Sequence, residues 1–227
     1  MAEALAIFDL EGTLYAGGGR VIWREVIRNR IRGRLITGKI FAHVLLQLLI
    51  DLLYRLRLLS RRGARLLGTK EMAALLAGLC EADMEQLVQA ITTKLDARLR
   101  SDICRILEEH KLQEHRLVLL SGAFQPIVDA IGRDLGIHIN IGTKLEKENG
   151  CYTGHLSGPI CFDEQKASVL KEFIKENHID VDFIRSYAYG DAISDKPMLE
   201  LVGNPVAVYP DPELRAHAQR QGWKIIG

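Results

Sequence analysis

The chain has 227 residues, 48% of them apolar and only six of them proline, and its formal net charge is +1. Such a chain can bury a sizeable core, which excludes a disordered protein and predicts one domain with a large insertion or two small domains. Its cysteines form no CxxC pair and no cluster with histidine, so neither a zinc site nor a disulfide framework is indicated. We expect reduced thiols at Cys80, Cys104, Cys151 and Cys161.

The first residues, MAEALAIFDLEG, have no basic region ahead of the apolar run, which argues against a secretory signal. The sequence therefore predicts a cytoplasmic protein whose first apolar run is a structural strand.

The charge is distributed unevenly along the chain. Between residues 15 and 70, thirteen Lys and Arg stand against two acids, Glu25 and Asp51, a net charge of +11 that leaves −10 for the remainder. This asymmetry indicates that the basic segment faces a membrane surface, a nucleic acid or a polyanionic substrate. Aromatic residues are sparse among the arginines, which argues against a base-stacking surface, so we expect no nucleic-acid partner.

The order of elements follows from hydrophobic periodicity. Residues 4–10 form an apolar run ending in an acid and a glycine, typical of a buried strand that feeds a tight turn. From about residue 21 to residue 100, apolar residues recur at helical spacing without a proline, which predicts an all-helical insert. Further along the chain, the expected elements are a strand at 115–120, a helix ending at Gly136, a β-hairpin pairing 143–146 with 152–156, a helix at 163–177, a strand in SYAYGD, a helix at 194–202 and a strand in PVAVYP.

Strands that alternate with helices predict an α/β fold with a mainly parallel sheet and a functional site at the carboxyl ends of the strands. We expect a Rossmann-like core made of residues 1–14 and 106–227, including the β-hairpin. The basic helical insert would span residues 15–105 and contain an apolar helix at 40–59.

Four short motifs carry the chemistry, and they come in a recognisable order. FDLEGTLY places Asp9 and Glu11 after the first strand, LLSG ends in Ser121 and Gly122, DEQKASVL contains Lys166, and YGDAISDKPMLELVGNPVAV contains Asp191 and Asp195. Together these motifs resemble the haloacid dehalogenase superfamily, and the nearest match is its phosphoserine-phosphatase-like subfamily IB. The resemblance covers the core portion of the chain and implies a phosphatase.

The chemistry of a phosphomonoester supports the same interpretation. Its dianion repels a carboxylate nucleophile, so attack needs a divalent cation and further cationic or N–H donors on the phosphoryl oxygens. Asp9 would attack phosphorus, forming an aspartyl-phosphate, and would bind the metal, with Asp191 as the second metal carboxylate. Oxygen ligands of this kind suit Mg²⁺.

The roles of the other site residues are implied by the resemblance alone. It implies that the backbone carbonyl of Glu11 is the third protein ligand of the metal. Asp195 would support the metal through water or orient Lys166. Ser121, the N–H groups that follow it at Gly122, and Lys166 would hold the phosphoryl oxygens.

Glu11 departs from the pattern, because phosphatases of this superfamily usually carry an aspartate there as the general acid. One extra methylene displaces the carboxyl by about an ångström, and a misplacement on that scale can cost about 100-fold in rate. Three interpretations stay open: a working general acid in a re-shaped site, a slow enzyme, or a phosphotransferase or binding protein that has lost turnover.

In this family the segment between the first two motifs is a helical cap that selects the substrate. Here the uncharged stretch at 40–50 is too short to span a bilayer. Arginines stand on both sides of residues 40–59 (Arg20, Arg24, Arg28, Arg30, Arg32 and Arg34 before it; Arg55, Arg57, Arg61, Arg62 and Arg65 after it).

Such a segment fits the buried centre of a helical cap with a solvated rim, and it also fits an interfacial element on anionic lipid. A dimer interface or a nucleic-acid surface is the remaining alternative. We expect a Mg²⁺-dependent phosphomonoester hydrolase acting on a lysophospholipid or other lipid-linked phosphate, peripheral on the membrane. The alternatives are a small-metabolite phosphatase of the phosphoserine type and a membrane-associated binding module. The oligomeric state is open.

Overall fold

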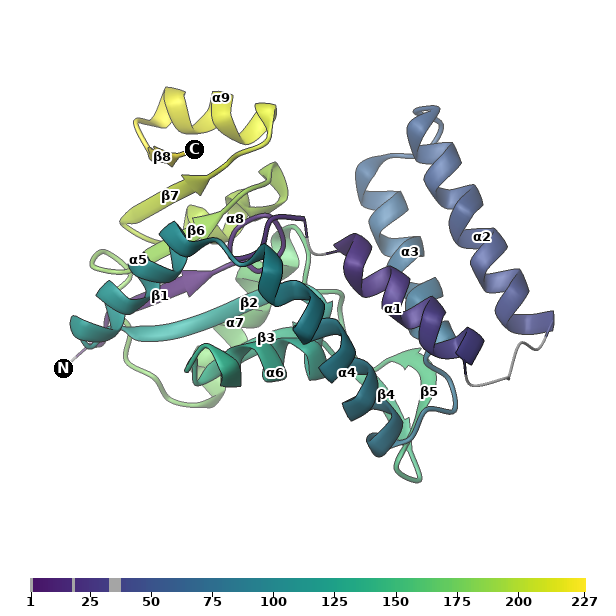
Figure 1. Ribbon diagram of the computed structural model, residues 1–227. Coiled ribbons are helices and arrows are strands. Elements are labelled where there is room, and N and C mark those ends of the chain that lie inside the picture. The colour runs from purple at the N-terminus through teal and green to yellow at the C-terminus, as the bar shows by residue number, and fades with distance from the viewer. Residues whose placement is uncertain (1, 18, 33–37) are drawn as a thin grey trace. The chain divides into compact units, whose positions relative to one another are not determined.

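The computed structural model describes residues 2–17, 19–32 and 38–227 (Figure 1). The chain divides into two compact units. The first, here called the sheet unit, comprises Met1–Gly19, Thr92–Thr143 and Cys161–Gly227, and the second, here called the helical unit, comprises Arg20–Ile91 and Lys144–Ile160. The sequence had placed the boundaries at 14/15 and 105/106 and had assigned the β-hairpin to the core, whereas here the hairpin groups with the helices.

The sheet unit contains a six-stranded sheet in the order β3-β2-β1-β6-β7-β8, and every neighbouring pair is parallel. The predicted α/β fold with a mainly parallel sheet is therefore confirmed. The strands are β1 (Leu5–Phe8), β2 (Arg116–Phe124), β3 (Ile139–Thr143), β6 (Tyr187–Gly190), β7 (Asn204–Val208) and β8 (Lys224–Ile226). Sequence analysis did not single out β3 and β8, which are the two edge strands of the sheet.

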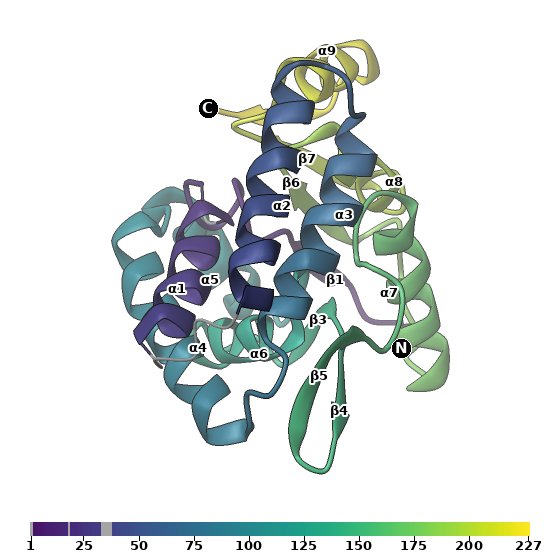
Figure 2. The same ribbon diagram turned by 90° about the vertical axis from the view of Figure 1, so that its right-hand side faces the viewer.

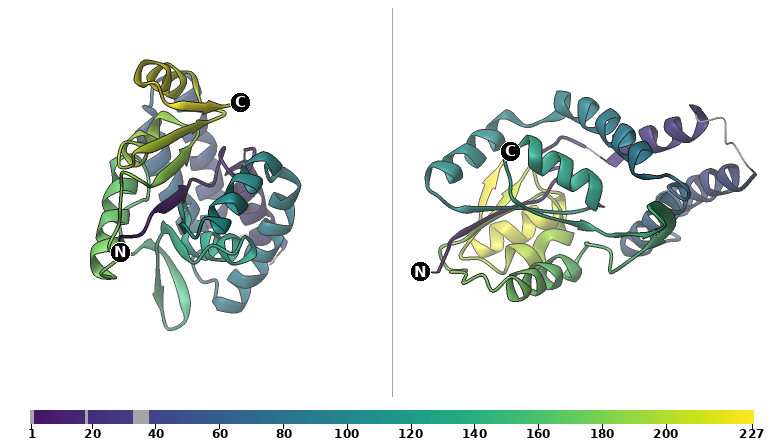
Figure 3. Two further views of the ribbon diagram at one scale, coloured as in Figure 1. Left: turned by 90° about the vertical axis from the view of Figure 1, so that its left-hand side faces the viewer. Right: turned by 90° about the horizontal axis from the view of Figure 1, so that it is seen from below.

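Helices cover both faces of this sheet (Figure 3). They are α5 (Ser101–Leu112), α6 (Gln125–Asp134), α7 (Glu164–Glu176), α8 (Lys196–Leu199) and α9 (Pro212–Gln221), with 3₁₀ turns at Asp96–Arg98 and Ile193–Asp195. On one face, α5 contacts β2, and α6 contacts β2 and β3. On the opposite face, α7 contacts β2 and α8 contacts β6. The helix expected at 194–202 is thus a 3₁₀ turn followed by one helical turn.

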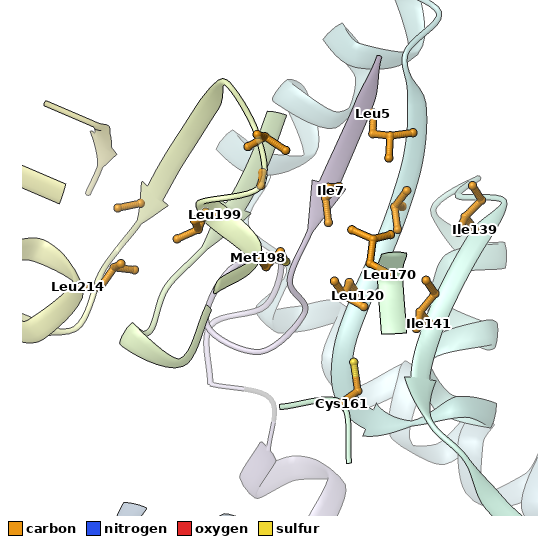
Figure 4. Close-up of a cluster of buried hydrophobic side chains, with 14 of the residues drawn as sticks. Leu5, Ile7, Leu120, Ile139, Ile141, Cys161, Leu170, Met198, Leu199 and Leu214 are labelled. Atoms are coloured by element: carbon orange, nitrogen blue, oxygen red, sulfur yellow. The ribbon is translucent and has the colours of Figure 1, made fainter. Parts of the chain in front are cut away.

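Alternation along β1 explains how the sheet is held between these helices. All four residues of β1 are buried. Leu5 and Ile7 join an apolar cluster with residues of α7, α8 and α9, among them Leu170 (Figure 4). Phe8 points to the other face, where its ring stacks on Tyr189 at 4.6 Å between centroids. A strand buried on both faces is typical of a parallel sheet. Because β1 is held in this way, the position of Asp9, the next residue, is fixed at the end of the strand.

The helical unit contains α1 (Gly19–Arg32), α2 (Gly38–Arg55), α3 (Arg61–Leu75) and most of α4 (Glu81–Leu95), together with β4 (Leu145–Glu148) and β5 (Cys151–Leu156). Helices α2 and α3 lie side by side (Figure 2). The apolar helix expected at 40–59 ends at Arg55, and Arg57 has a positive φ of 59°, which interrupts the helix. The hairpin β4–β5 is antiparallel as predicted, and it turns at Asn149 and Gly150, which both have positive φ.

One expectation about the cysteines is wrong. Cys80 and Cys151 form a disulfide, 71 residues apart in sequence, whereas Cys104 and Cys161 are free thiols. The pairing follows from the backbone, because Tyr152 N–H donates to the carbonyl of Leu79 and Gly78 N–H donates to the carbonyl of Tyr152. These bonds place the loop before α4 against β5, a contact that spacing along the sequence does not reveal.

Candidate active site

The register of three strands brings the predicted residues to one edge of the sheet. Phe8 pairs with Leu119 of β2 and with Tyr189 of β6. Asp9 follows Phe8 directly, while Ser121 and Asp191 come two residues after their paired positions. Because the strands are parallel, these side chains start from neighbouring points, with Asp9 and Asp191 directly after β1 and β6 and Ser121 within the last four residues of β2.

Lys166 lies at the centre of the site. It is 2% exposed, stands in the first turn of α7, and donates hydrogen bonds to Oδ1 of Asp9 at 2.5 Å and to Oδ1 of Asp195 at 2.6 Å. Helix α7 is anchored by Leu170, which is fully buried one turn further along. An ammonium held between two carboxylates this far from solvent is a strong, charge-assisted arrangement.

Three carboxylates converge around this lysine. Asp9, Asp191 and Asp195 each offer an oxygen atom within 4.8 Å of the others. The second oxygen of Asp195, Oδ2, accepts hydrogen bonds from the backbone N–H groups of Asp191 at 3.2 Å and Ala192 at 3.1 Å. With one oxygen on Lys166 and the other on the 191–192 backbone, Asp195 orients both the lysine and the loop that carries Asp191.

Two glycines let the loop that carries Asp191 and Asp195 lie close to the turn after β1. Gly12 has φ +91°, and a Cβ there would lie 2.1 Å from Oδ2 of Asp191. A Cβ on Gly190 would lie 2.7 Å from the Cβ of Asp195. Any larger side chain at these positions would displace the loop that carries Asp191 and Asp195. The two glycines are therefore required for the geometry of the site. Sequence analysis used Gly12 only as the sign of a tight turn after the first strand, and it did not single out Gly190.

The side chain of Glu11 lies apart from the three aspartates. Its carboxylate stands beside Gly19, where a Cβ would come within 2.9 Å of Oε2. Within the described ranges, the carboxylates that meet are those of Asp9, Asp191 and Asp195, without that of Glu11. The charge of Glu11 nevertheless raises the pKa of Asp9. A contribution of the Glu11 backbone carbonyl to a metal site stays a prediction.

Ser121 and Gly122 are held at the same edge by local hydrogen bonds. Ser121 is 1% exposed, and its hydroxyl accepts a hydrogen bond from the N–H of Ala123 at 3.1 Å. The carbonyl of Gly122 accepts a hydrogen bond from Thr143 Oγ1 at 2.9 Å. Thr143 is a further support of the site. The sequence had placed it in the β-hairpin, whereas it is the last residue of β3 and the hairpin strand β4 begins at Leu145.

Burial and mutual repulsion shape the electrostatics. Burial raises the pKa of Asp9 to about 7, the Lys166 ammonium opposes the rise, and the charge of Asp195 adds to it. Burial likewise raises the pKa of Asp191 to about 8, with the charges of Asp9 and Asp195 acting in the same direction. Burial alone would lower the pKa of Lys166, but the same two aspartates hold it above its ordinary value. A single ammonium therefore does not balance the three carboxylates.

This charge imbalance is what a divalent cation would offset. The donor set is made of carboxylate oxygens, which are the hard ligands that Mg²⁺ prefers. The raised pKa values of Asp9 and Asp191 arise from burial without enough positive charge, and a bound cation reverses that effect. The residues present therefore fit a magnesium ion held by Asp9 and Asp191.

A shallow cavity of ≈ 370 Å³ lies elsewhere in the sheet unit, at the amino ends of the strands. Its lining includes Glu3, Arg116 and Asn177. None of the residues discussed above contributes to it, and Arg116 forms an exposed ion pair with Glu3 there. The cavity therefore lies at the opposite ends of the strands from the candidate site.

The sequence comparisons specify the family to which this parallel α/β sheet, with its buried Asp–Lys–Asp arrangement, belongs. Residues 6–200 match the family described as haloacid dehalogenase-like hydrolase. This match covers most of the chain, and the chain belongs to that family.

The relatives include phosphatases. The chain is 31% identical over 163 residues to an inhibition of morphological differentiation protein of Streptomyces azureus, covering 69% of this chain and 58% of that protein. It is 28% identical over 225 residues to a phosphoserine phosphatase of Mycobacterium tuberculosis, covering 98% of this chain and 70% of that protein. The chain thus spans 58% and 70% of the lengths of these two relatives. These likenesses place it among the phosphoserine-phosphatase-like members of the family.

Solved structures agree with the fold. A protein of unknown function from Bordetella pertussis superimposes with a TM-score of 0.83 at 24% identity, covering 100% of this chain and 99% of that one. A phosphoserine phosphatase solved as a phospho-aspartyl intermediate analogue superimposes with a TM-score of 0.64 at 18% identity, covering 100% of this chain and 93% of that one.

Proposed function

We propose that this protein is a Mg²⁺-dependent phosphomonoester hydrolase in which Asp9 is the nucleophile. The observation that carries the proposal is the buried Lys166, which bridges Asp9 and Asp195 while Asp191 stands beside them. Magnesium, when bound by Asp9, Asp191 and the backbone carbonyl of Glu11, supplies the positive charge that lets a carboxylate approach a phosphate dianion.

In the first half-reaction, a carboxylate oxygen of Asp9 attacks phosphorus. The new bond forms as the bond from phosphorus to the leaving oxygen breaks, and the proton that the leaving oxygen needs comes from Glu11. Lys166, the Ser121 hydroxyl and the N–H of Gly122 hold the phosphoryl oxygens, where negative charge is concentrated. The product on the protein is an aspartyl-phosphate.

In the second half-reaction, water attacks the same phosphorus. Glu11, now ionised, takes a proton from that water, and the bond between phosphorus and the Asp9 oxygen breaks. Inorganic phosphate leaves and the Asp9 carboxylate is restored. Asp195 keeps Lys166 and the Asp191 loop in place throughout, through its contacts to both.

Two substrate classes have separate support. A small phosphomonoester such as phosphoserine is supported by the activity named for the mycobacterial relative. A lipid-linked phosphomonoester, such as a lysophospholipid phosphate, is supported by the exposed leucines and arginines of the helical unit.

The test measures Mg²⁺-dependent release of inorganic phosphate from phosphoserine and, in mixed micelles, from lysophosphatidic acid. We expect release from at least one substrate and none from Asp9→Asn. Asp134→Asn, at an exposed aspartate at the end of α6, is the matched control and should behave like the wild type. Equal release by wild type and Asp9→Asn would refute Asp9 as nucleophile.

Glu11→Asp separates a working enzyme from a binding module that has lost turnover. If the site is built around glutamate, shortening the side chain withdraws the acid and lowers kcat on the order of 100-fold. A rise in kcat of that size would mean that Glu11 is an impaired acid. Absence of phosphate release from both proteins, with Mg²⁺ bound, would support the binding module instead.

A further inference from the structure

Helix α2 turns its apolar side outward. Phe41, Leu45, Leu48 and Leu52 recur at spacings of four, three and four residues, which places them in one stripe along the helix. Their exposed fractions are 65%, 57%, 54% and 51%. An ordinary surface helix directs such a stripe into the core and its polar residues to solvent.

The buried side of α2 contains polar residues beside the apolar Ile50, which is 4% exposed. Gln47 is 8% exposed and lies close to Gly68 of α3, where a Cβ would come within 3.2 Å of its amide nitrogen. His43 Nδ1 lies 2.6 Å from a carboxylate oxygen of Glu71 on the same helix α3. The contact between His43 and Glu71 joins α2 to α3, which lie side by side (Figure 2), whereas Phe41, Leu45, Leu48 and Leu52 remain exposed.

The surface around the stripe is positively charged. Residues 38–75 contain seven Lys and Arg against two acids, Asp51 and Glu71. Arg55, Arg57, Arg61 and Arg62 are exposed. Arg34, which the sequence also assigned to this basic region, lies outside the described residues. An apolar stripe with exposed cations at the carboxyl end of its helix matches the two properties of an anionic bilayer surface, its acyl chains and its negative headgroups.

We propose that the α2–α3 helix pair docks on an anionic lipid surface, with Phe41, Leu45, Leu48 and Leu52 entering the interface and the arginines contacting the headgroups. No helix of the described residues has the length and apolar character needed to cross a bilayer, so the contact is interfacial. A second copy of the chain is the less favourable occupant, because a symmetric contact would bring two net-positive surfaces together. This inference goes beyond the proposed hydrolysis and does not depend on it.

The experiment is co-sedimentation of the full-length chain with vesicles of phosphatidylcholine alone and of phosphatidylcholine mixed with phosphatidylglycerol. We expect binding to the mixed vesicles only, weakened by salt because the headgroup contacts are exposed to solvent. Leu45→Gln, Leu48→Gln and Leu52→Gln combined should abolish it, since these side chains are exposed and their replacement leaves the core intact. Leu112→Gln combined with Ile184→Gln, two exposed apolar residues of the sheet unit, is the control and should bind like the wild type.

Charge is tested separately. Arg55→Gln combined with Arg57→Gln should lower the vesicle partition coefficient on the order of tenfold, because each basic residue near an anionic surface contributes appreciably to binding. Arg105→Gln combined with Arg220→Gln, two exposed arginines of the sheet unit, should change it little.

Two results would overturn the proposal. One is a failure of the wild type to sediment with anionic vesicles. The other is a dimer seen by light scattering that becomes a monomer in the triple leucine variant, which would make the stripe an interface between copies. Phosphate release from soluble phosphoserine, measured in parallel, tests the catalytic proposal independently, so the two can fail separately.

Discussion

Lys166 shows how a single residue organises this site. It is almost fully buried and contacts carboxylates from two segments that lie 186 residues apart in sequence, Asp9 and Asp195. A buried ammonium is tolerated only when it is paired, and the two aspartates provide that pairing. The same contacts bring the nucleophile and the acidic loop together, so stability and function rest on the same atoms.

Gly12→Ala tests the close approach of the acidic loop. The change introduces a Cβ 2.1 Å from Oδ2 of Asp191 at a residue with φ +91°. We expect kcat to fall on the order of 100-fold, since displacement by an ångström is enough for that. Gly150→Ala, which also has positive φ but nothing within 4 Å of the added Cβ, is the control. Gly150→Ala introduces the same backbone strain without the steric clash. Steady-state kinetics on both variants therefore separates the effect of strain from that of the clash.

His110 gives a pH dependence of stability. Burial lowers its pKa to about 4, and the neighbouring His115 adds to the shift. The unfolded chain takes up a proton near pH 6.5 while the folded chain does not until about pH 4, so stability is full above this range and decreases as the pH falls through it. We expect a loss of up to about 3 kcal/mol in the free energy of unfolding.

Urea unfolding at neutral and acidic pH checks this expectation. His110→Gln keeps a polar group near Tyr189, which hydrogen-bonds the ring nitrogen Nε2 of His110 at 2.8 Å, and it removes the ionisable ring. The acid-induced loss in the free energy of unfolding should be smaller for His110→Gln than for the wild type. His155→Gln, at an exposed histidine, should retain the full loss. The same acid loss in wild type and His110→Gln would contradict the assignment to His110.

Among the elements, the hairpin β4–β5 was predicted from the sequence, but the segment against which it packs was not. The turn at Asn149–Gly150 is readable from the sequence, because both residues adopt positive φ readily. The attachment of β5 to the loop before α4 depends on backbone hydrogen bonds between segments far apart in the chain. The disulfide between Cys80 and Cys151 closes that attachment.

Removing this disulfide should destabilise the helical unit. For a loop that closes 71 residues, the chain-entropy model gives about 4 kcal/mol as an upper estimate. We expect Cys80→Ser to lower the melting temperature, and a reductant to lower that of the wild type to a similar value. Cys104→Ser removes a free thiol and is the control. Calorimetry showing no effect of reductant on the wild type would mean that the disulfide does not contribute.

For the whole molecule, charge is the property that connects sequence, site and partner. Three carboxylates of the sheet unit, those of Asp9, Asp191 and Asp195, meet at one site, and the segment 15–70 carries a net charge of +11. Each concentration of like charge opposes folding unless a counter-charge is bound. Mg²⁺ for the first and an anionic surface for the second are the counter-charges proposed above.

Metal binding should therefore raise the thermal stability. Mg²⁺ at one hundred times its dissociation constant adds about 2.7 kcal/mol, because it binds the folded state alone. Thermal unfolding with Mg²⁺ and with a chelator measures the difference, which Asp191→Asn should reduce strongly and Asp134→Asn should preserve. An identical shift in Asp191→Asn would place the metal elsewhere.

The sequence by itself determined the class of fold and the candidate site residues. Apolar runs alternating with helical periodicity specify a parallel sheet, and motifs at strand ends specify which side chains reach its carboxyl edge. These are local signals, since a strand and the residue after it are contiguous. The tertiary structure alone decided the Cys80–Cys151 pair, the role of Gly12 beside Asp191, and the outward orientation of the leucines on α2. Each of these depends on which distant segment packs against the residue, and periodicity along one chain does not contain that information.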